Sequence, residues 1–259
     1  MWATVALFLG LFAVSWLDWM LAALLFIFYM SYLPQKRDSV RRWMPVFPWL
    51  RTQHCRLTYE GRLDVLGGES KARIFVFHPH GVHCVGATLL GSDPTMTHLR
   101  IACSSVLFWV PIVKEFAGWS GAFPCHADNI REMLKSNQPI VLYPGGLSEI
   151  PGADYLRPSK PRIGFLRIAM ELGVDVVPCW VDGENDLYDV LHPLPWLQKL
   201  SYQLFRYPWP LISWGWKWVP FLPKAKKVTI RVGDPIATRY DGNIAVYEEQ
   251  YRAALHKLK

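Results

Sequence analysis

The sequence has 259 residues, of which 28 are Lys or Arg and 21 are Asp or Glu, so the formal net charge is +7. Hydrophobic residues make up 51% of the chain and charged residues only 19%, which is too apolar for a disordered protein. This composition also excludes a fibrous protein, a disulfide scaffold and a nucleic-acid tail. The five Cys include no C-x-x-C pair, which favours a reducing compartment and argues against a zinc site.

The N-terminal stretch, residues 2–33, is almost wholly apolar. As one helix it would run to roughly 48 Å, against a hydrocarbon core of about 30 Å. Its most polar part is the middle, where Trp16, Asp18 and Trp19 lie close together. We therefore expect either a re-entrant helical hairpin that bends there or one long tilted helix, and we assign residues 1–34 to a membrane hairpin or anchor.

Basic residues follow this stretch. They are Lys36, Arg37, Arg41, Arg42, Arg51, Arg56 and Arg62, against Asp38 and Glu60. The positive-inside rule places this segment, and with it residues 35–259, on the cytosolic side of a membrane. Residues 43–50 combine aromatic side chains with Pro and predict a stretch that lies on the same leaflet; the alternative is a solvated basic linker beside an aromatic core patch.

After residue 70, short apolar runs alternate with amphipathic segments. The predicted strands are 72–77, 98–103, 139–143, 174–181 and 227–232, and the predicted helices are 129–137, 164–172 and 243–258, with Gly173 as a C-cap. Alternation of this kind indicates an α/β domain with a largely buried sheet.

A second aromatic segment covers residues 194–223. It holds five Trp between Trp196 and Trp218, is interrupted by Pro195, Pro208, Pro210 and Pro220, and is followed by a run of Lys. It has no continuous helical period and too many Pro for a spanning helix. An apolar wedge with a basic edge predicts a surface that dips into an anionic leaflet, and a lid over the core is compatible with that reading.

Two histidines flank a proline in Phe77-His78-Pro79-His80-Gly81, at the end of a predicted strand. Strand ends are where α/β folds place their sites, and an imidazole can act as a general base near neutral pH. We expect His80 to be the base and His78, the more enclosed of the two, to support it. A metal site would need a third ligand, for which His83 is the candidate.

A second predicted strand ends at Pro144-Gly145-Gly146-Leu147-Ser148-Glu149. Gly145 and Gly146 can turn backbone N–H groups toward an oxyanion or a phosphate. Ser148 does not satisfy G-x-S-x-G, because Ile150 occupies the last Gly position, so a serine nucleophile is disfavoured. Glu149 either orients an imidazole or caps the following turn.

A third group is basic and surrounds the start of a predicted helix; its members are Arg157, Lys160, Arg162 and Arg167. Such a position suits an anionic ligand such as a nucleotide phosphate, although a solvated helix face is the alternative.

Taken in order, these features resemble the type-2 diacylglycerol acyltransferase family and its monoacylglycerol and wax-alcohol relatives. The matching motifs are His78-Pro79-His80-Gly81, Gly121-Ala122-Phe123-Pro124, Pro144 to Glu149, 162–181, Gly183-Glu184-Asn185, Trp218-Val219-Pro220, Gly233-Asp234-Pro235-Ile236 and the final helix. The resemblance implies a mixed α/β sheet flanked by helices, like that of the glycerolipid acyltransferases.

The resemblance also implies transfer of a fatty acyl group from acyl-CoA to diacylglycerol, or to another lipid alcohol. The broader glycerolipid acyltransferases pair a His with an Asp five positions later, where this chain has His83 or Val85. We therefore expect Glu149 to supply the carboxylate to His80 or His78. Gly81, Gly145, Gly146 and Ser148 are expected at the oxyanion and substrate, and Lys160, Arg162 and Arg167 at acyl-CoA. No metal or cofactor is required.

The expected partners are acyl-CoA, a lipid acceptor and a bilayer or lipid droplet surface, not a nucleic acid. The expected location is the endoplasmic reticulum membrane, with the catalytic domain facing the cytosol. The sequence leaves open whether the chain forms a homo-oligomer. A non-catalytic lipid-binding membrane protein is the rival function, and an esterase lacks a credible serine nucleophile.

Overall fold

The computed structural model describes residues 20, 21, 24, 46–66, 72–96, 98–110, 113–156, 162–205, 207–219, 222–240 and 242–259. The chain divides into two compact units, Met1–Gln35 and Lys36–Lys259. The predicted membrane hairpin, residues 1–34, lies outside the described residues apart from Met20, Leu21 and Leu24. In the described part of the chain, no helix has the length and hydrophobicity needed to cross a membrane.

A seven-stranded sheet forms the centre of the second unit, in the order β1-β9-β6-β2-β5-β3-β4. Its strands are β1 (Thr58–Gly61), β2 (Arg73–His78), β3 (Arg100–Cys103), β4 (Ala122–Pro124), β5 (Ile140–Leu142), β6 (Asp175–Asp182) and β9 (Thr229–Val232). All neighbours are parallel except β6 and β9, so the sheet is mixed. The expected mixed α/β sheet is confirmed, and all five predicted strands belong to it.

The α-helices of this unit are α3 (Val46–Trp49), α4 (Val85–Gly91), α5 (Val113–Trp119), α6 (Ala127–Lys135), α7 (Gly164–Leu172), α8 (Pro195–Phe205) and α9 (Ile244–Leu258). A π-helical turn, Leu50–His54, and short 3₁₀ segments complete the helical structure, among them Gly146–Glu149 and Glu184–Asp186. The three predicted helices correspond to α6, α7 and α9, and Gly173 caps α7 at φ +61°.

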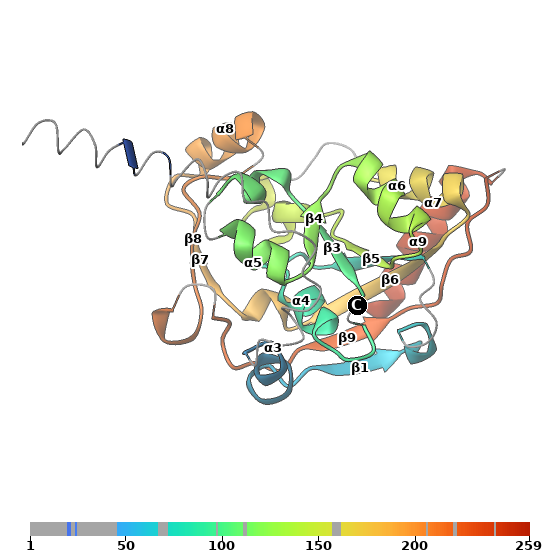
Figure 1. The fold of residues 1–259 in the computed structure, drawn as a ribbon, viewed down its shortest axis with the longest axis horizontal. Coiled ribbons are helices and arrows are strands. Elements are labelled where there is room, and N and C mark those ends of the chain that lie inside the picture. The colour runs from blue at the N-terminus through green and yellow to red at the C-terminus, as the bar shows by residue number, and fades with distance from the viewer. Residues whose placement is uncertain are drawn as a thin grey trace, which may run out of the picture. The chain divides into compact units, whose positions relative to one another are not determined.

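Two hydrophobic cores lie on opposite faces of the sheet, because successive side chains of a strand point to opposite sides. Phe75 and Phe77 of β2 pack with α4 and the turn after α3. Ile74 and Val76, the alternate residues, pack with α6, α7 and α9, which lie together on one side of the sheet in Figure 1. His78 has the same parity as these two residues and therefore falls on the α9 face.

The second aromatic segment folds as α8 followed by β8 (Ile212–Trp214), which pairs antiparallel with β7 (Asp189–Leu191). Pro195 occupies the first position of α8, where its missing N–H costs nothing. Figure 1 shows these three elements together, away from α6, α7 and α9. A small cluster around Ile150, Ala153 and Leu156 joins them to the chain that follows β5.

Candidate active site

Three neighbouring parallel strands, β5, β2 and β6, end at the same edge of the sheet. The loop after β2 carries His80, the turn after β5 carries Glu149, and the turn after β6 carries Glu184. Parallel α/β sheets bind their ligands outside the carboxyl ends of their strands. This edge therefore collects one imidazole pair and two carboxylates.

Glu149 joins the two histidines. Its Oε1 contacts Nδ1 of His78, and its Oε2 accepts a hydrogen bond of 2.9 Å from the backbone N–H of His80. The other ring nitrogen of His78, Nε2, contacts the hydroxyl of Tyr251 on α9. Both nitrogens of His78 are thus occupied, and the residue is only 8% exposed. Glu149 reaches the imidazole of His78 and only the backbone of His80.

His80 has one ring nitrogen tied to the backbone. Its Nδ1 lies 2.6 Å from the carbonyl oxygen of Gly81, which can only accept, so Nδ1 carries the proton. Nε2 is then the basic nitrogen, and the thiol of Cys84 donates to it across 3.4 Å. Burial lowers the pKa of His80 below its ordinary value, and the positive charge of Arg162 acts in the same direction. His80 is therefore neutral at pH 7 and presents a lone pair at Nε2.

Glu184 fixes the far end of the histidine loop. It is 2% exposed, and its two oxygens accept hydrogen bonds of 2.7 Å from the backbone N–H groups of Val85 and Gly86, at the start of α4. A Cβ on Gly81 would lie 2.6 Å from Cγ of Glu184, so this position must be glycine. Burial raises the pKa of Glu184 to about 7.

The turn after β5 is shaped around Glu149. A Cβ on Gly145 would overlap the Glu149 carboxyl group, and one on Gly146, at φ +56°, would lie 2.7 Å from Nη1 of Arg162. The Gly146 N–H donates to the Tyr143 carbonyl within the turn. The Ser148 hydroxyl donates to the Gly145 carbonyl over 2.7 Å, so it is occupied in the turn.

The basic residues of the third group differ in their distance from the site. Arg162 lies against Gly146 and donates to the hydroxyl of Tyr202 on α8 over 2.6 Å. Arg167 is on the exposed face of α7, whereas Lys160 lies outside the described residues. His83 points elsewhere: its ring packs against Tyr188 at 4.7 Å, and burial lowers its pKa to about 4. Within the described residues, no group of three His, Cys, Asp or Glu could hold a metal ion.

The structure thus brings together His78, His80, Glu149 and Arg162, which the sequence had already singled out. It adds three residues to this edge, Glu184, Cys84 and Tyr251, for which no site role was expected. The sequence did contain a sign of Glu184, because this residue follows a predicted strand and belongs to one of the matching motifs. It contained no sign of Tyr251, whose helical spacing is that of an ordinary core residue.

Comparison with known proteins identifies the family of the chain. A family model described as diacylglycerol acyltransferase matches residues 9–258. The chain belongs to the diacylglycerol acyltransferase family. The resemblance drawn from the sequence motifs is therefore confirmed.

The relatives include two kinds of acyltransferase. Diacylglycerol O-acyltransferase 2 of Xenopus laevis is 27% identical over 227 residues, which cover 73% of this chain and 60% of that protein. Acyl-CoA wax alcohol acyltransferase 2 of Homo sapiens is 28% identical over 223 residues, which cover 73% of this chain and 65% of that protein. The chain thus spans less than two thirds of the length of these relatives.

A solved structure with a similar fold is known. The 1-acyl-sn-glycerophosphate acyltransferase PlsC from Thermotoga maritima superposes with a TM-score of 0.50 at 16% identity, covering 89% of this chain and 82% of that one. At this identity the likeness concerns the fold alone. It supports the glycerolipid acyltransferase-like sheet expected from the sequence.

The buried carboxylate of Glu184 makes stability depend on pH. Its pKa is about 7 in the folded chain and 4.5 for an exposed Glu, so the folded chain binds more protons between these values. The unfolding temperature of the wild type relative to Glu184→Gln should therefore fall as pH rises from about 4.5 to about 7. Thermal melts of the full chain in detergent measure this difference.

Glu132→Gln, on the exposed face of α6, is the matched control and should give a difference that does not vary with pH in this window. A Glu184 difference that stays flat or grows with pH would contradict the buried, proton-binding carboxylate.

Proposed function

We propose that the chain transfers a fatty acyl group from acyl-CoA to the hydroxyl of diacylglycerol and so produces triacylglycerol. The main support for this proposal is the state of His80. Its imidazole is neutral, its Nδ1–H donates to the Gly81 carbonyl, and its Nε2 is basic. Lipid binding alone has no use for such a group. Family membership supports the same reaction class.

The base acts on the acceptor alcohol. The hydroxyl replaces the Cys84 thiol as the donor to Nε2 of His80. As the hydroxyl oxygen attacks the thioester carbon, its proton moves to Nε2, a step that contributes roughly 10²–10⁴-fold. The carbon–sulfur bond then breaks, the ester forms, and the CoA sulfur takes the proton from His80. The balance is one alcohol and one acyl-CoA in, one ester and one CoA thiol out.

Glu149 supports this step without touching the reacting nitrogen. It holds the backbone N–H of His80 and the ring of His78, so it fixes where the base stands. The developing oxyanion would be stabilised by the turn at Gly145 and Gly146. Because the Gly146 N–H already donates to the Tyr143 carbonyl within its turn, we assign the larger share to Gly145.

Acyl-CoA brings phosphate groups, for which the basic residues at the start of α7 are suited. Arg162 is exposed and lies against Gly146 in the turn after β5, and Lys160 and Arg167 belong to the same basic group of the sequence. A guanidinium binds phosphate through paired hydrogen bonds. This reaction requires no metal or redox cofactor.

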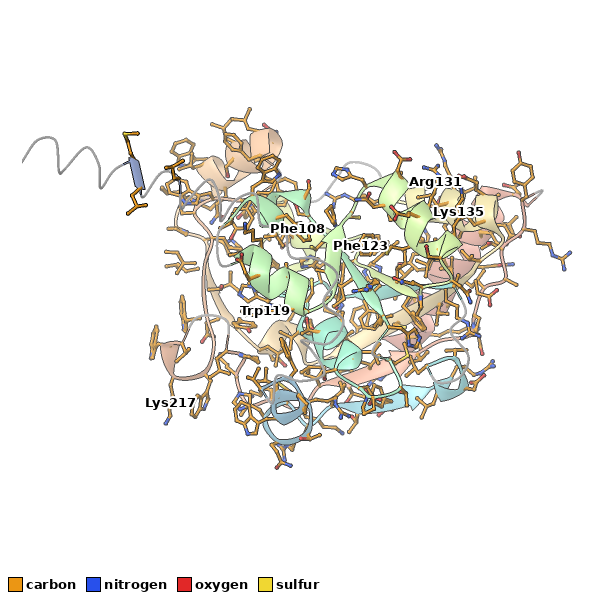
Figure 2. The ribbon with its side chains drawn as sticks, in the orientation of Figure 1. Phe108, Trp119, Phe123, Arg131, Lys135 and Lys217 are labelled. Carbon is orange, nitrogen blue, oxygen red and sulfur yellow. The ribbon has the colours of Figure 1, made fainter. Side chains whose placement is uncertain are left out.

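We also propose that the protein works at a membrane, in the endoplasmic reticulum with this domain in the cytosol, or on lipid droplets. Exposed aromatic side chains support this: Trp218 is 74% exposed, Trp109 73%, and Trp196 and Trp209 are exposed too. Lys217, which is labelled in Figure 2, follows β8 and lies over the ring of Trp216. Residues 1–34 would add the membrane hairpin.

The acceptor could instead be monoacylglycerol or a long-chain alcohol, and the wax alcohol acyltransferase relatives fit that alternative. The shape of the site that binds the acceptor would decide between these alcohols, because the chemistry at His80 is the same for each.

The function is tested by acyl transfer in membranes that contain the full chain. With labelled oleoyl-CoA and a panel of alcohols, the wild type should form triacylglycerol from diacylglycerol. His80→Ala should lower turnover by about 10²–10⁴-fold, because the base is removed. The matched control is His126→Ala, an exposed histidine before α6, which should keep full turnover. His80→Ala retaining more than a tenth of the wild-type rate would exclude general-base catalysis by this residue.

The membrane proposal has its own test. A chain that lacks residues 2–33 should still sediment in part with membranes, because the exposed aromatic side chains remain. Replacing Trp196, Trp209 and Trp218 by Ser in that chain should release it, whereas Tyr240→Ser, an exposed aromatic outside this segment, should not. Full release by the deletion alone would show that the aromatic segment does not bind lipid.

A further inference from the structure

Tyr251 connects the C-terminal helix to the candidate active site. It lies on α9, 6% exposed, with its ring against Phe165 of α7 at a centroid distance of 5.4 Å. Its hydroxyl contacts Nε2 of His78, a residue 173 positions earlier in the sequence. The contact exists because His78 falls on the face of the sheet that α9 covers.

The hydrogen bonds around His78 have a defined direction. A carboxylate oxygen only accepts, so Nδ1 of His78 donates to Oε1 of Glu149, whose Oε2 accepts from the backbone N–H of His80. The second nitrogen of a neutral imidazole is then an acceptor. Nε2 of His78 therefore accepts from the Tyr251 hydroxyl, which keeps its proton because burial raises its pKa.

We propose that Tyr251 is a positioning residue for acyl transfer, which fixes the orientation of the His78 ring and, through Glu149, the backbone at the catalytic His80. The proposal rests on the proposed function only for its effect on turnover. It also assigns His78 a role: with both ring nitrogens occupied, His78 orients Glu149 and is not itself the base.

Loss of the Tyr251 hydroxyl would leave the buried Nε2 of His78 without its hydrogen-bond donor. The imidazole ring would then be held at Nδ1 alone, by Glu149, and could turn about that contact. Glu149 would follow the ring and loosen its hold on the His80 N–H. Acyl-CoA binding does not involve this chain of hydrogen bonds, so the expected effect is on kcat.

Tyr251→Phe removes only the oxygen and keeps the buried ring. Its kcat should fall about 3- to 10-fold, as expected for one lost hydrogen bond, with the KM for acyl-CoA unchanged. Tyr247→Phe is the matched control on the same helix, because its hydroxyl accepts from the Arg239 N–H, 3.1 Å away, and not from the histidine site. This control should keep the wild-type kcat.

A double-mutant cycle separates positioning from simple destabilisation. If Tyr251 acts through Glu149, Tyr251→Phe should lower kcat much less in a Glu149→Gln background than in the wild type. Equal losses in both backgrounds, or an unchanged kcat in Tyr251→Phe, would overturn the proposal.

Nitrogen NMR of ¹⁵N-histidine-labelled protein tests the hydrogen bonds independently of activity. The His78 ring should be protonated at Nδ1 and unprotonated at Nε2, and Tyr251→Phe should shift both the His78 ring signals and the His80 amide signal. Tyr247→Phe should shift neither. A chain without transferase activity that shows these shifts would refute the proposed function and leave the positioning role standing; absence of the shifts would overturn that role even in an active enzyme.

Discussion

The carboxylate of Glu149 is the contact on which the rest of the site depends. One oxygen orients the ring of His78, and the other holds the backbone N–H of His80. The sequence around it follows from this arrangement: Gly145 has no side chain because the Glu149 carboxyl group occupies that space. A carboxylate in this place can satisfy two donors at once, which neither a hydroxyl nor an amide oxygen would do as strongly.

A second carboxylate completes the loop between β2 and α4. Glu149 holds the loop where it leaves the sheet, and Glu184 holds it where α4 begins, through the N–H groups of Val85 and Gly86. His80 lies between these two fixed points. The base thus stands on a loop whose backbone is held at both ends, and that arrangement keeps Nε2 oriented before a substrate arrives.

The sequence predicted the parts of this arrangement that depend on local pattern. Apolar runs located five strands of the sheet, the spacing of apolar residues located α7 and α9, and the strand ends indicated that Glu149 would meet a histidine. The sequence did not indicate which atoms would meet: we expected Glu149 to serve the imidazole of either histidine, and it binds the ring of His78 and only the backbone of His80. Side-chain direction after a strand end is set by the turn, which local pattern does not specify.

Other features depend on contacts between distant segments. Tyr251 lies on a helix that packs against the sheet only in the folded chain, so nothing local separates it from Tyr247, four residues earlier. α4 was missed because it is short and contains Gly86 and Gly91, which are poor helix formers. Its first turn is stabilised instead by Glu184, about a hundred residues later in the chain.

If His80 is the general base, its Nε2 must face the thioester of bound acyl-CoA. A structure of the full chain in a lipid nanodisc, with an acyl-CoA analogue in which a methylene group replaces the thioester sulfur, shows whether it does. We expect the carbonyl carbon of the analogue to lie next to Nε2 of His80, with room between them for one hydroxyl, and Glu149 to keep its contact with the His80 backbone. A carbonyl group bound away from the edge formed by β5, β2 and β6, with His80 touching no part of the analogue, would exclude His80 as the base.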